Sequence, residues 1–281
     1  MQPPRLQYDR IIITGASSGF GQAFAKTLAP HAGELLLVAR SEEKLRQLSA
    51  ELEERHPGLN ASVLPCDLAD EPSLDNLVSR LESLPPASTL LVNNAGAGDY
   101  GEFADGRWDK IRTLLRLNAE SLTRLCHTMI PGMKSHGGDI VNISSLGALL
   151  PIPDFAVYAA TKAYVSSLSE ALRLELREHG IRVLAVCPGP VSTGFGKAAR
   201  RPGFTGNMMP GRNAFDTSVE TVVRDSLRAL SRGRARVFPG MKIRLAALLL
   251  GAAPLWLIRF FMGKRPRKVQ PASNDSPHTP S

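Results

Sequence analysis

The chain has 281 residues, of which 43% are hydrophobic and 21% are charged. This length and composition fit one large α/β domain followed by a tail, and they exclude a chain that is disordered throughout. The net charge of +8 is unevenly placed, because residues 242–281 hold seven basic residues and a single acid, Asp275. A nearly neutral body, with no helix-turn-helix or zinc-finger spacing, argues against a nucleic-acid partner.

Neither disulfide nor metal chemistry is indicated. Cys66, Cys126 and Cys187 lie far apart with no C-x-x-C pair, and the six histidines show no metal-ligand spacing. We therefore expect no disulfide framework and no metal site. The polar, proline-bearing stretch at residues 1–10 is not followed by a signal-peptide core, so we expect a cytoplasmic protein.

Short β-rich apolar runs alternate with segments of helical periodicity over the first 240 residues, which is typical of a parallel sheet with helices on both faces. Strands are expected at residues 10–14, 34–39, 61–65, 89–93, 139–144, 182–187 and 236–238. Helices are expected at residues 20–28, 42–55 (capped by Ser41), 73–84, 108–135 as one or two helices, 158–178 and 218–231.

Two later stretches depart from this alternation. Residues 188–217 are rich in glycine and proline and longer than an ordinary connection, as lids often are. Residues 243–262 are mostly apolar but are interrupted by Arg244, Pro254 and Arg259. We therefore expect a catalytic domain at 1–240, an apolar helical segment at 241–263 and a disordered basic and polar tail at 264–281.

The first expected strand runs directly into a glycine-rich turn and then a helix. Free backbone N–H groups and the positive end of a helix dipole attract phosphate, and missing β-carbons allow close approach. The stretch therefore predicts a site for the pyrophosphate of a dinucleotide. Its candidate residues are Gly15, Ser17, Ser18, Gly19, Phe20 and Gly21.

This turn resembles that of the short-chain dehydrogenase/reductase family, in its single-domain branch. Further matches follow in chain order, namely Asn93-Asn94-Ala95-Gly96, Asn118, Ser145, Tyr158-Ala159-Ala160-Thr161-Lys162 and Pro188-Gly189. The resemblance covers residues 10–240. It implies an α/β fold with a doubly wound, mostly parallel, seven-stranded Rossmann-like sheet and helices on both faces. The active site would lie at the carboxyl ends of the strands.

The catalytic candidates are Asn118, Ser145, Tyr158 and Lys162. Tyr158 and Lys162 are four residues apart on an expected helix, so they share a face, and the ammonium is expected to lower the pKa of the phenol from about 10. The resemblance implies that Ser145 hydrogen-bonds the substrate oxygen, with Ser144 as second choice. It also implies that Asn118 holds a water that links Lys162 to solvent.

The end of the second strand bears on the cofactor. It carries no carboxylate to accept the ribose hydroxyls of NAD, whereas Arg40 and Ser41 suit a 2′-phosphate, which favours NADP(H) over NAD(H).

The resemblance implies further cofactor contacts. Asp67 and Leu68 would lie at the adenine, Asn94 and Gly96 at the adenosine, Tyr158 and Lys162 at the nicotinamide ribose, and Val191 and Thr193 at the carboxamide or phosphates. Asp67 can also be read as a residue that only turns the chain.

These residues predict an oxidoreductase that moves a hydride between a nicotinamide and a carbonyl or secondary alcohol. Apolar residues in the expected pocket favour a lipophilic ketone or aldehyde, and they are Leu149, Leu150, Ile152, Phe155, Phe195 and Phe204. The alternatives are a non-catalytic NADP-binding regulator, and an epimerase or dehydratase on the same fold. The intact catalytic set argues against the first, and the second usually has an extra C-terminal substrate domain.

Two kinds of partner remain open for the rest of the surface. The resemblance implies a homo-oligomer, a dimer or tetramer, that pairs through the helices near residues 108–135 and 158–178. The longest uncharged C-terminal stretch, 245–258, is shorter than the ~20 residues of a membrane-spanning helix. It fits either an anionic membrane surface, with Trp256 near the interface, or packing over the active site or a partner subunit.

Overall fold

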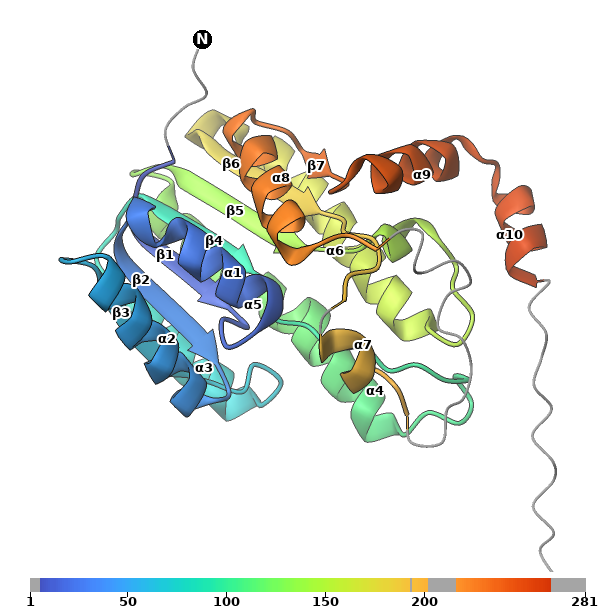
Figure 1. Ribbon diagram of the computed structural model, residues 1–281, viewed down its shortest axis with the longest axis horizontal. Coiled ribbons are helices and arrows are strands. Elements are labelled where there is room, and N and C mark those ends of the chain that lie inside the picture. The colour runs from blue at the N-terminus through green and yellow to red at the C-terminus, as the bar shows by residue number, and fades with distance from the viewer. Residues whose placement is uncertain (1–5, 193, 202–215, 264–281) are drawn as a thin grey trace, which may run out of the picture.

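The computed structural model describes residues 6–192, 194–201 and 216–263. Seven strands form one sheet in the order β3-β2-β1-β4-β5-β6-β7, and all neighbouring pairs are parallel (Figure 1). The expected doubly wound α/β sheet is therefore confirmed. The strands are β1 (Tyr8–Thr14), β2 (Ala32–Ala39), β3 (Asn60–Pro65), β4 (Thr89–Asn93), β5 (Gly138–Ile143), β6 (Ile181–Val186) and β7 (Arg236–Val237).

Helices cover both faces of this sheet. The α-helices are α1 (Gly19–Leu28), α2 (Glu42–Arg55), α3 (Glu71–Glu82), α4 (Trp108–Leu115), α5 (Ser121–Met133), α6 (Ala156–Glu175), α7 (Gly194–Ala198), α8 (Val219–Ser231), α9 (Met241–Ala252) and α10 (Leu255–Gly263). Shorter helical turns are η1 (Ala29–His31), η2 (Arg116–Glu120), η3 (Leu146–Leu149) and η4 (Arg177–His179).

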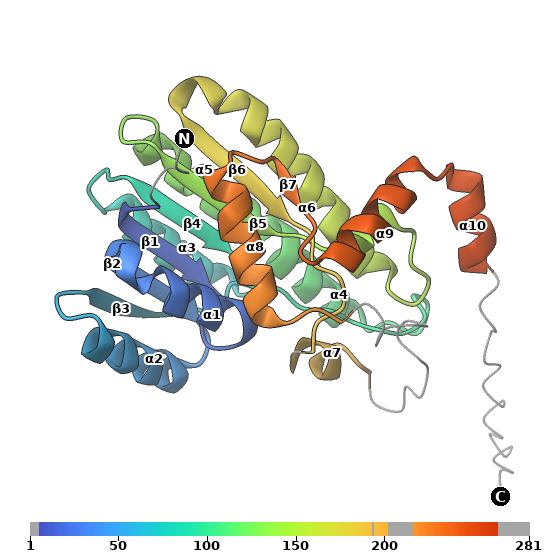
Figure 2. The same cartoon turned by 45° about the horizontal axis from the view of Figure 1, so that its top comes forward.

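Strand side chains alternate between two buried cores. Ile11 and Ile13 pack with residues of α1, α2 and α8, whereas Ile12 packs with residues of α3, α5 and α6. Figure 2 shows α1, α2 and α8 in front of the sheet. Because both faces are covered, the strands read as nearly continuous apolar runs.

The strand order reverses at β1, which lies between β2 and β4. The connections from β1 and from β4 therefore leave toward opposite halves of the sheet, which opens a crevice at their carboxyl ends. Ligands of doubly wound sheets bind at such a switch point. Thr14 ends β1 and Asn93 ends β4, so the glycine-rich turn and Asn94 both border the crevice.

The stretch expected as one or two helices near residues 108–135 is one continuous run. Helices α4 and α5 are joined by η2, a single π-helical turn that contains Asn118. A π turn admits one extra residue into the hydrogen-bond ladder and is frequent at functional sites.

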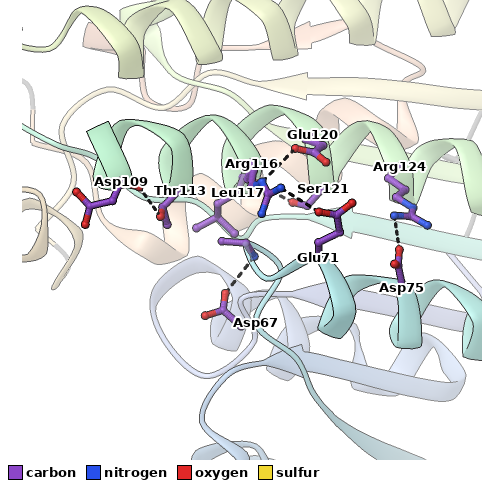
Figure 3. A network of polar contacts seen from close by, with 11 residues as sticks. Asp67, Glu71, Asp75, Asp109, Thr113, Arg116, Leu117, Glu120, Ser121 and Arg124 are labelled. Atoms are coloured by element: carbon purple, nitrogen blue, oxygen red, sulfur yellow. Dashed lines mark hydrogen bonds and ion pairs between the residues drawn. The ribbon is translucent and has the colours of Figure 1, made fainter. Parts of the chain in front are cut away.

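Ion pairs tie α3 to this long helical run (Figure 3). The Arg116 guanidinium lies 3.0 Å from the Glu71 carboxylate. Farther along both helices, Arg124 pairs with Asp75, which is one turn after Glu71 on α3. All four side chains are partly exposed, so each pair contributes only about 0.5 kcal/mol to stability. The pairs fix the helix that carries Asn118 against its neighbour.

Smaller differences concern caps and loops. Ser41 occupies the N-cap of α2, but within the described residues its hydroxyl makes no capping hydrogen bond, contrary to expectation. Helix α6 begins at Ala156, two residues before the expected start. The expected lid contains the short helix α7, while residues 202–215, with Phe204, lie outside the described residues.

The apolar C-terminal segment forms α9 and α10. In the part of the chain that the structure describes, no single helix has the length and hydropathy of a membrane span, and only these two together pass such a test, with a bend of 114° between them. The expected tail at 264–281 lies outside the described residues.

Candidate active site

The glycine-rich turn needs its glycines for two separate reasons. Gly15 and Gly19 adopt φ angles of +65° and +55°, which other residues rarely do. A β-carbon on Gly21 would lie only 2.2 Å from the carbonyl oxygen of Gly15. The turn can therefore fold back onto α1 only without these side chains.

The N-terminus of α1 is open to an anion. Ser18 is its exposed N-cap residue, and among the described residues its hydroxyl accepts no hydrogen bond from the first turn, which also lacks an acidic residue. The first N–H groups of a helix have no intrahelical acceptor, and the helix dipole is positive there. Together with the glycine cradle, this end of α1 fits the pyrophosphate of a dinucleotide.

Asn94 braces the same turn from β4. Its amide nitrogen donates to the carbonyl oxygens of Thr14 (2.9 Å) and Gly15 (3.3 Å). The Thr14 hydroxyl accepts from the N–H groups of Asn94 (2.9 Å) and Ala95 (3.0 Å). Sequence reasoning missed Thr14, although it is the last residue of the first expected strand, directly before the glycine-rich turn. Both residues shape the crevice at the switch point.

At the end of β2, Arg40 is largely exposed, with 79% of its side chain accessible, and its guanidinium lies 3.9 Å from the Asp67 carboxylate. Asp67 also accepts a hydrogen bond from the N–H of Ala69 (3.0 Å), so it turns the chain after β3, as one of its two readings expected. The Leu68 side chain is buried in the core, and Ser41 is half-buried. A cofactor could therefore meet only the backbone of Leu68.

Lys162 of α6 is buried, and its ammonium donates to the carbonyl oxygen of Ile143 at 2.8 Å. Burial lowers the pKa of Lys162 to about 8. Ser144 is also buried, donates to the main-chain carbonyl of Lys162 (2.8 Å) and pairs with Ser166 (2.7 Å). The Ser144 hydroxyl thus fastens α6 to the end of β5, which leaves the half-buried Ser145 for a substrate.

Tyr158 lies one turn before Lys162 on α6, with the lysine nitrogen 5.7 Å from the ring centroid. Burial raises the pKa of Tyr158 to about 12, and a hydrogen bond with Ser145 offsets only part of this rise. The expected lowering of this pKa by Lys162 is therefore wrong for the structure as described. The ammonium donates to the Ile143 carbonyl, and desolvation is the largest cause of the raised pKa of the phenol.

From the π turn, the Asn118 side chain makes three hydrogen bonds to Ala97 and Thr161. Its nitrogen donates to the carbonyl of Ala97 (2.9 Å) and to the Thr161 hydroxyl (3.1 Å), and its oxygen accepts from the N–H of Ala97 (2.9 Å). A β-carbon on Gly96 would lie 3.2 Å from that oxygen and 3.4 Å from the Lys162 nitrogen. Asn118, Gly96 and Lys162 therefore adjoin. Thr161, inside the quoted Tyr-Lys motif, was missed as their support.

An aromatic wall surrounds the tyrosine. The Phe155 ring stacks on Tyr158 with centroids 4.2 Å apart, and Phe195 of α7 lies 5.5 Å from Tyr158 on a tilt. A β-carbon on Gly98 would lie 3.0 Å from both phenylalanine rings. The substrate side of the site is thus apolar, as the sequence indicated for these two phenylalanines.

The segment after α7 is strapped to the loop after β4. The N–H of Tyr100 donates to the carbonyl oxygen of Ala199 (2.7 Å), and the Arg201 guanidinium donates two hydrogen bonds of 3.0 and 2.7 Å to the Asp99 carboxylate. Both side chains of this ion pair are mostly buried. These contacts of Arg201 with Asp99 and of Tyr100 with Ala199, which we call the strap, hold α7 and Phe195 over Tyr158. Sequence reasoning missed it, because the partners are far apart in the chain.

The last expected cofactor residues follow β6. Val191 is half-buried and packs against the core under α1 and α8, and Thr193 lies outside the described residues. Ser192 beside them donates to the Asp216 carboxylate at 2.7 Å. Within the described ranges, no cluster of three or more His, Cys, Asp or Glu is placed to hold a metal.

A family model of short chain dehydrogenases matches residues 9–202. The chain belongs to the short-chain dehydrogenase family. Its members are oxidoreductases that bind a nicotinamide cofactor and act on small molecules. The chain is 36% identical over 191 residues to a very-long-chain 3-oxoacyl-CoA reductase-like protein of Arabidopsis thaliana, which covers 65% of this chain and 59% of that relative. It spans about three fifths of the length of the curated relatives with the strongest matches.

Solved structures of the family agree over nearly the whole chain. A short-chain dehydrogenase from Sphingobium yanoikuyae in complex with NADPH has a TM-score of 0.73 and 31% identity, and the match covers 94% of this chain and 98% of that one. A bulky-bulky ketone specific alcohol dehydrogenase from Comamonas testosteroni has a TM-score of 0.71 and 27% identity, with 96% and 99% covered.

Proposed function

We propose that the protein is an NADP(H)-dependent oxidoreductase that interconverts a carbonyl compound and its secondary or primary alcohol. The observation that carries this proposal is the meeting of Ser145, Tyr158 and Lys162 at the end of β5, beside the glycine cradle of β1. A bound nicotinamide would supply or accept the hydride at this point.

Tyr158 serves as the proton donor in the reductive direction. With a pKa of about 12 its phenol stays protonated at neutral pH, so it is ready to protonate the alkoxide that forms on the substrate. Ser145 donates a hydrogen bond to the same oxygen while charge develops on it. These two hydroxyls define where the carbonyl oxygen must lie.

Lys162 supports the tyrosine through its charge. Its pKa of about 8 keeps most of the side chain charged at neutral pH, where the ammonium stabilises the phenolate left after proton transfer. Both amide hydrogens of Asn118 are already donated, to Ala97 and Thr161. A water at this residue would therefore donate its own hydrogen bond to an oxygen atom of Asn118. We assign that water the task of returning a proton to the tyrosine.

The preference for NADP(H) rests on Arg40. Its planar guanidinium is exposed at the end of β2, and among the described residues it has a long contact of 3.9 Å to Asp67, so it can turn to a 2′-phosphate. The Sphingobium structure, at 31% identity, contains NADPH, which supports the same choice for this chain.

The substrate class follows from the aromatic wall. Phe155 and Phe195 flank the phenol of Tyr158, so a large apolar group beside the carbonyl would be desolvated there. The printed names of the Arabidopsis and Comamonas relatives, which concern long acyl chains and bulky ketones, point the same way. No observation favours the non-catalytic alternative, since the reacting side chains are in place.

Consumption of NADPH with a panel of small, aromatic and long-chain ketones and aldehydes tests the proposal. We expect turnover with the larger members, and a kcat/KM for NADPH at least about tenfold above that for NADH. Binding of NADPH without turnover of any panel member would identify a regulator instead.

We also propose a homo-oligomer that pairs through α4, α5 and α6. Tyr164 and Leu174 of α6 are exposed, which suits a helix face covered by a second copy. Light scattering after size exclusion would show the mass of the wild type, and Leu174→Asp should lower it. A cytoplasmic location remains a prediction of the sequence.

A further inference from the structure

Helices α9 and α10 carry a large uncovered apolar surface, which we call the C-terminal apolar surface. The two helices project from the side of the sheet domain (Figures 1 and 2). Each large side chain of this surface is 51–75% exposed, and they are Met241, Leu245, Leu248, Leu249, Leu255, Trp256, Phe260 and Phe261. Exposed apolar side chains of this size, gathered on two successive helices, mark an interaction site.

The inner side of α9 is firmly seated. Ile243 is fully buried, and together with Ala247 it packs against Leu146. A β-carbon on Gly189 would lie only 2.2 Å from the Ile243 side chain, so the helix rests directly on the Pro188-Gly189 turn. The sequence left open whether this segment meets a membrane, a partner subunit or its own active site. The inner side of α9 packs against the loops of its own candidate active site.

These loops belong to the catalytic centre. Leu146 follows Ser145 directly, and its N–H donates to the carbonyl of Pro188 at 2.8 Å. The helix thus sits on the two loops that leave β5 and β6, and its uncovered side faces away from them. Whatever binds that side lies next to the substrate region.

The charged residues of α9 and α10 are all basic. Lys242, Arg244 and Arg259 are exposed on α9 and α10. No acidic residue occurs from 241 to 274, and the sequence adds Lys264, Arg265, Arg267 and Lys268 just after α10. Apolar side chains bracketed by cations match a lipid surface with anionic headgroups, where each basic residue contributes about 1 kcal/mol.

We propose that the C-terminal apolar surface docks the protein onto an anionic lipid surface, with α9 and α10 lying in the interface. A second copy of the chain is a poorer occupant, because pairing of two such surfaces would bring their cations together. The 114° bend between the helices suits two short segments that lie in an interface.

Docking by this surface would place the active-site loops at the lipid boundary. A carbonyl compound dissolved in the membrane could then reach Ser145 and Tyr158 without crossing water. This consequence rests on the proposed function, and it assigns the substrate to lipids or lipid-soluble ketones and aldehydes.

The two tryptophans of the chain allow a direct test. Trp256 on α10 and Trp108 at the start of α4 are nearly equally exposed, at 68% and 66%. The full chain is prepared as Trp108→Phe, which keeps Trp256, and as Trp256→Phe, which keeps Trp108. Each is mixed with vesicles of phosphatidylglycerol and phosphatidylcholine, or of phosphatidylcholine alone.

We expect a blue shift of the emission only where Trp256 is kept, and chiefly with the anionic vesicles at low salt. No shift, or equal shifts from both tryptophans, would overturn the proposal.

Co-sedimentation with the same vesicles tests the side chains. Leu248→Asp, and Lys242, Arg244 and Arg259 changed together to Glu, should each weaken binding at least about tenfold. Phe103→Asp, on the loop after β4, is the matched control, because Phe103 and Leu248 are 63% and 69% exposed, and it should bind like the wild type. Self-association that Leu248→Asp abolishes, without vesicle binding, would assign the surface to a second copy instead.

Turnover separates this proposal from the proposed function. Leu248→Asp should reduce a water-soluble ketone at the wild-type rate and a vesicle-dissolved ketone more slowly. A wild type that reduces soluble ketones but binds no vesicles contradicts only the docking. A wild type that binds vesicles but reduces nothing contradicts only the proposed function.

Discussion

Ser144 and Ser145 are adjacent in the chain but face different tasks. The Ser144 hydroxyl is hydrogen-bonded to the Lys162 carbonyl and to Ser166, whereas the Ser145 side chain is hydrogen-bonded to Tyr158. We expect Ser145→Ala to lower kcat about 100-fold, since it removes a donor to the substrate oxygen, with only the small fall in Tm that follows from losing the hydrogen bond its hydroxyl accepts from the N–H of Gly147. Ser144→Ala should instead cost about 1 kcal/mol of stability, with a smaller loss of kcat. The reverse pattern in kcat and thermal melting would exchange their roles.

The pKa of Lys162 predicts the pH profile of reduction. Tyr158 remains protonated well beyond neutral pH, so the donor is present throughout. Lys162 loses its charge as pH rises through about 8, and the phenolate left after transfer then lacks its cation. We expect kcat/KM for ketone reduction to be level below that pH and to fall above it. A reduction rate that rises between neutral pH and pH about 9 would contradict this role.

Arg40 should decide the cofactor. Arg40→Asp removes a phosphate partner and adds a carboxylate that can accept ribose hydroxyls, so the ratio of kcat/KM for NADPH to that for NADH should fall at least about tenfold. Arg46→Asp, on the exposed side of α2, is the control and should leave the ratio unchanged. A wild type that already prefers NADH would refute this reading of β2.

At the scale of elements, the strap over the site is the most informative. Arg201 binds Asp99 through two nitrogen atoms and also donates to the Glu102 carbonyl at 2.7 Å. A lysine keeps the charge but not the fork, so Arg201→Lys should raise KM for a bulky ketone several-fold, with a smaller effect on KM for NADPH. Kinetics with both substrates measure this. Equal changes in the two KM values would show that the strap does not act through Phe195.

The elements themselves were largely predictable from the sequence. Short apolar runs located every strand of the described sheet, because both faces bury apolar side chains, and helical periodicity located the helices between them. The π turn at Asn118 was not predictable, since one extra residue in a hydrogen-bond ladder leaves no periodic mark. The Arg201–Asp99 pair was missed because only the folded chain brings its partners together.

For the candidate site too, the sequence predicted which residues take part but not how their side chains are surrounded. The motif residues could be named because they resemble those of the short-chain dehydrogenase/reductase family, and because several of them follow strands, where a doubly wound sheet binds its ligands. The direction of the Tyr158 pKa was misjudged, because helical spacing gives the distance to Lys162 but not the burial of the phenol. Burial depends on Phe155 and on α7, which contributes Phe195 from a distant part of the chain.

At the scale of the whole molecule, the candidate site lies at the carboxyl ends of the parallel strands, and the C-terminal helices border it. The glycine cradle follows β1, Asn94 follows β4, Ser145 follows β5 and the turn under α9 follows β6. A cofactor would therefore lie across the switch point, with the substrate between the strap and α9. This arrangement places the candidate site and the inner side of α9 at the same ends of the strands.

The central claim is hydride transfer to a carbonyl carbon with Tyr158 as proton donor. It is tested most directly by incubating a lipophilic ketone with NADPH that carries deuterium at both hydrogen positions of its hydride-donating carbon, followed by mass spectrometry of the product. The wild type should yield an alcohol with one deuterium on the carbinol carbon. Tyr158→Phe should bind NADPH equally and form product at least about 100-fold more slowly. Alcohol without deuterium, or an unchanged rate in Tyr158→Phe, would contradict the account.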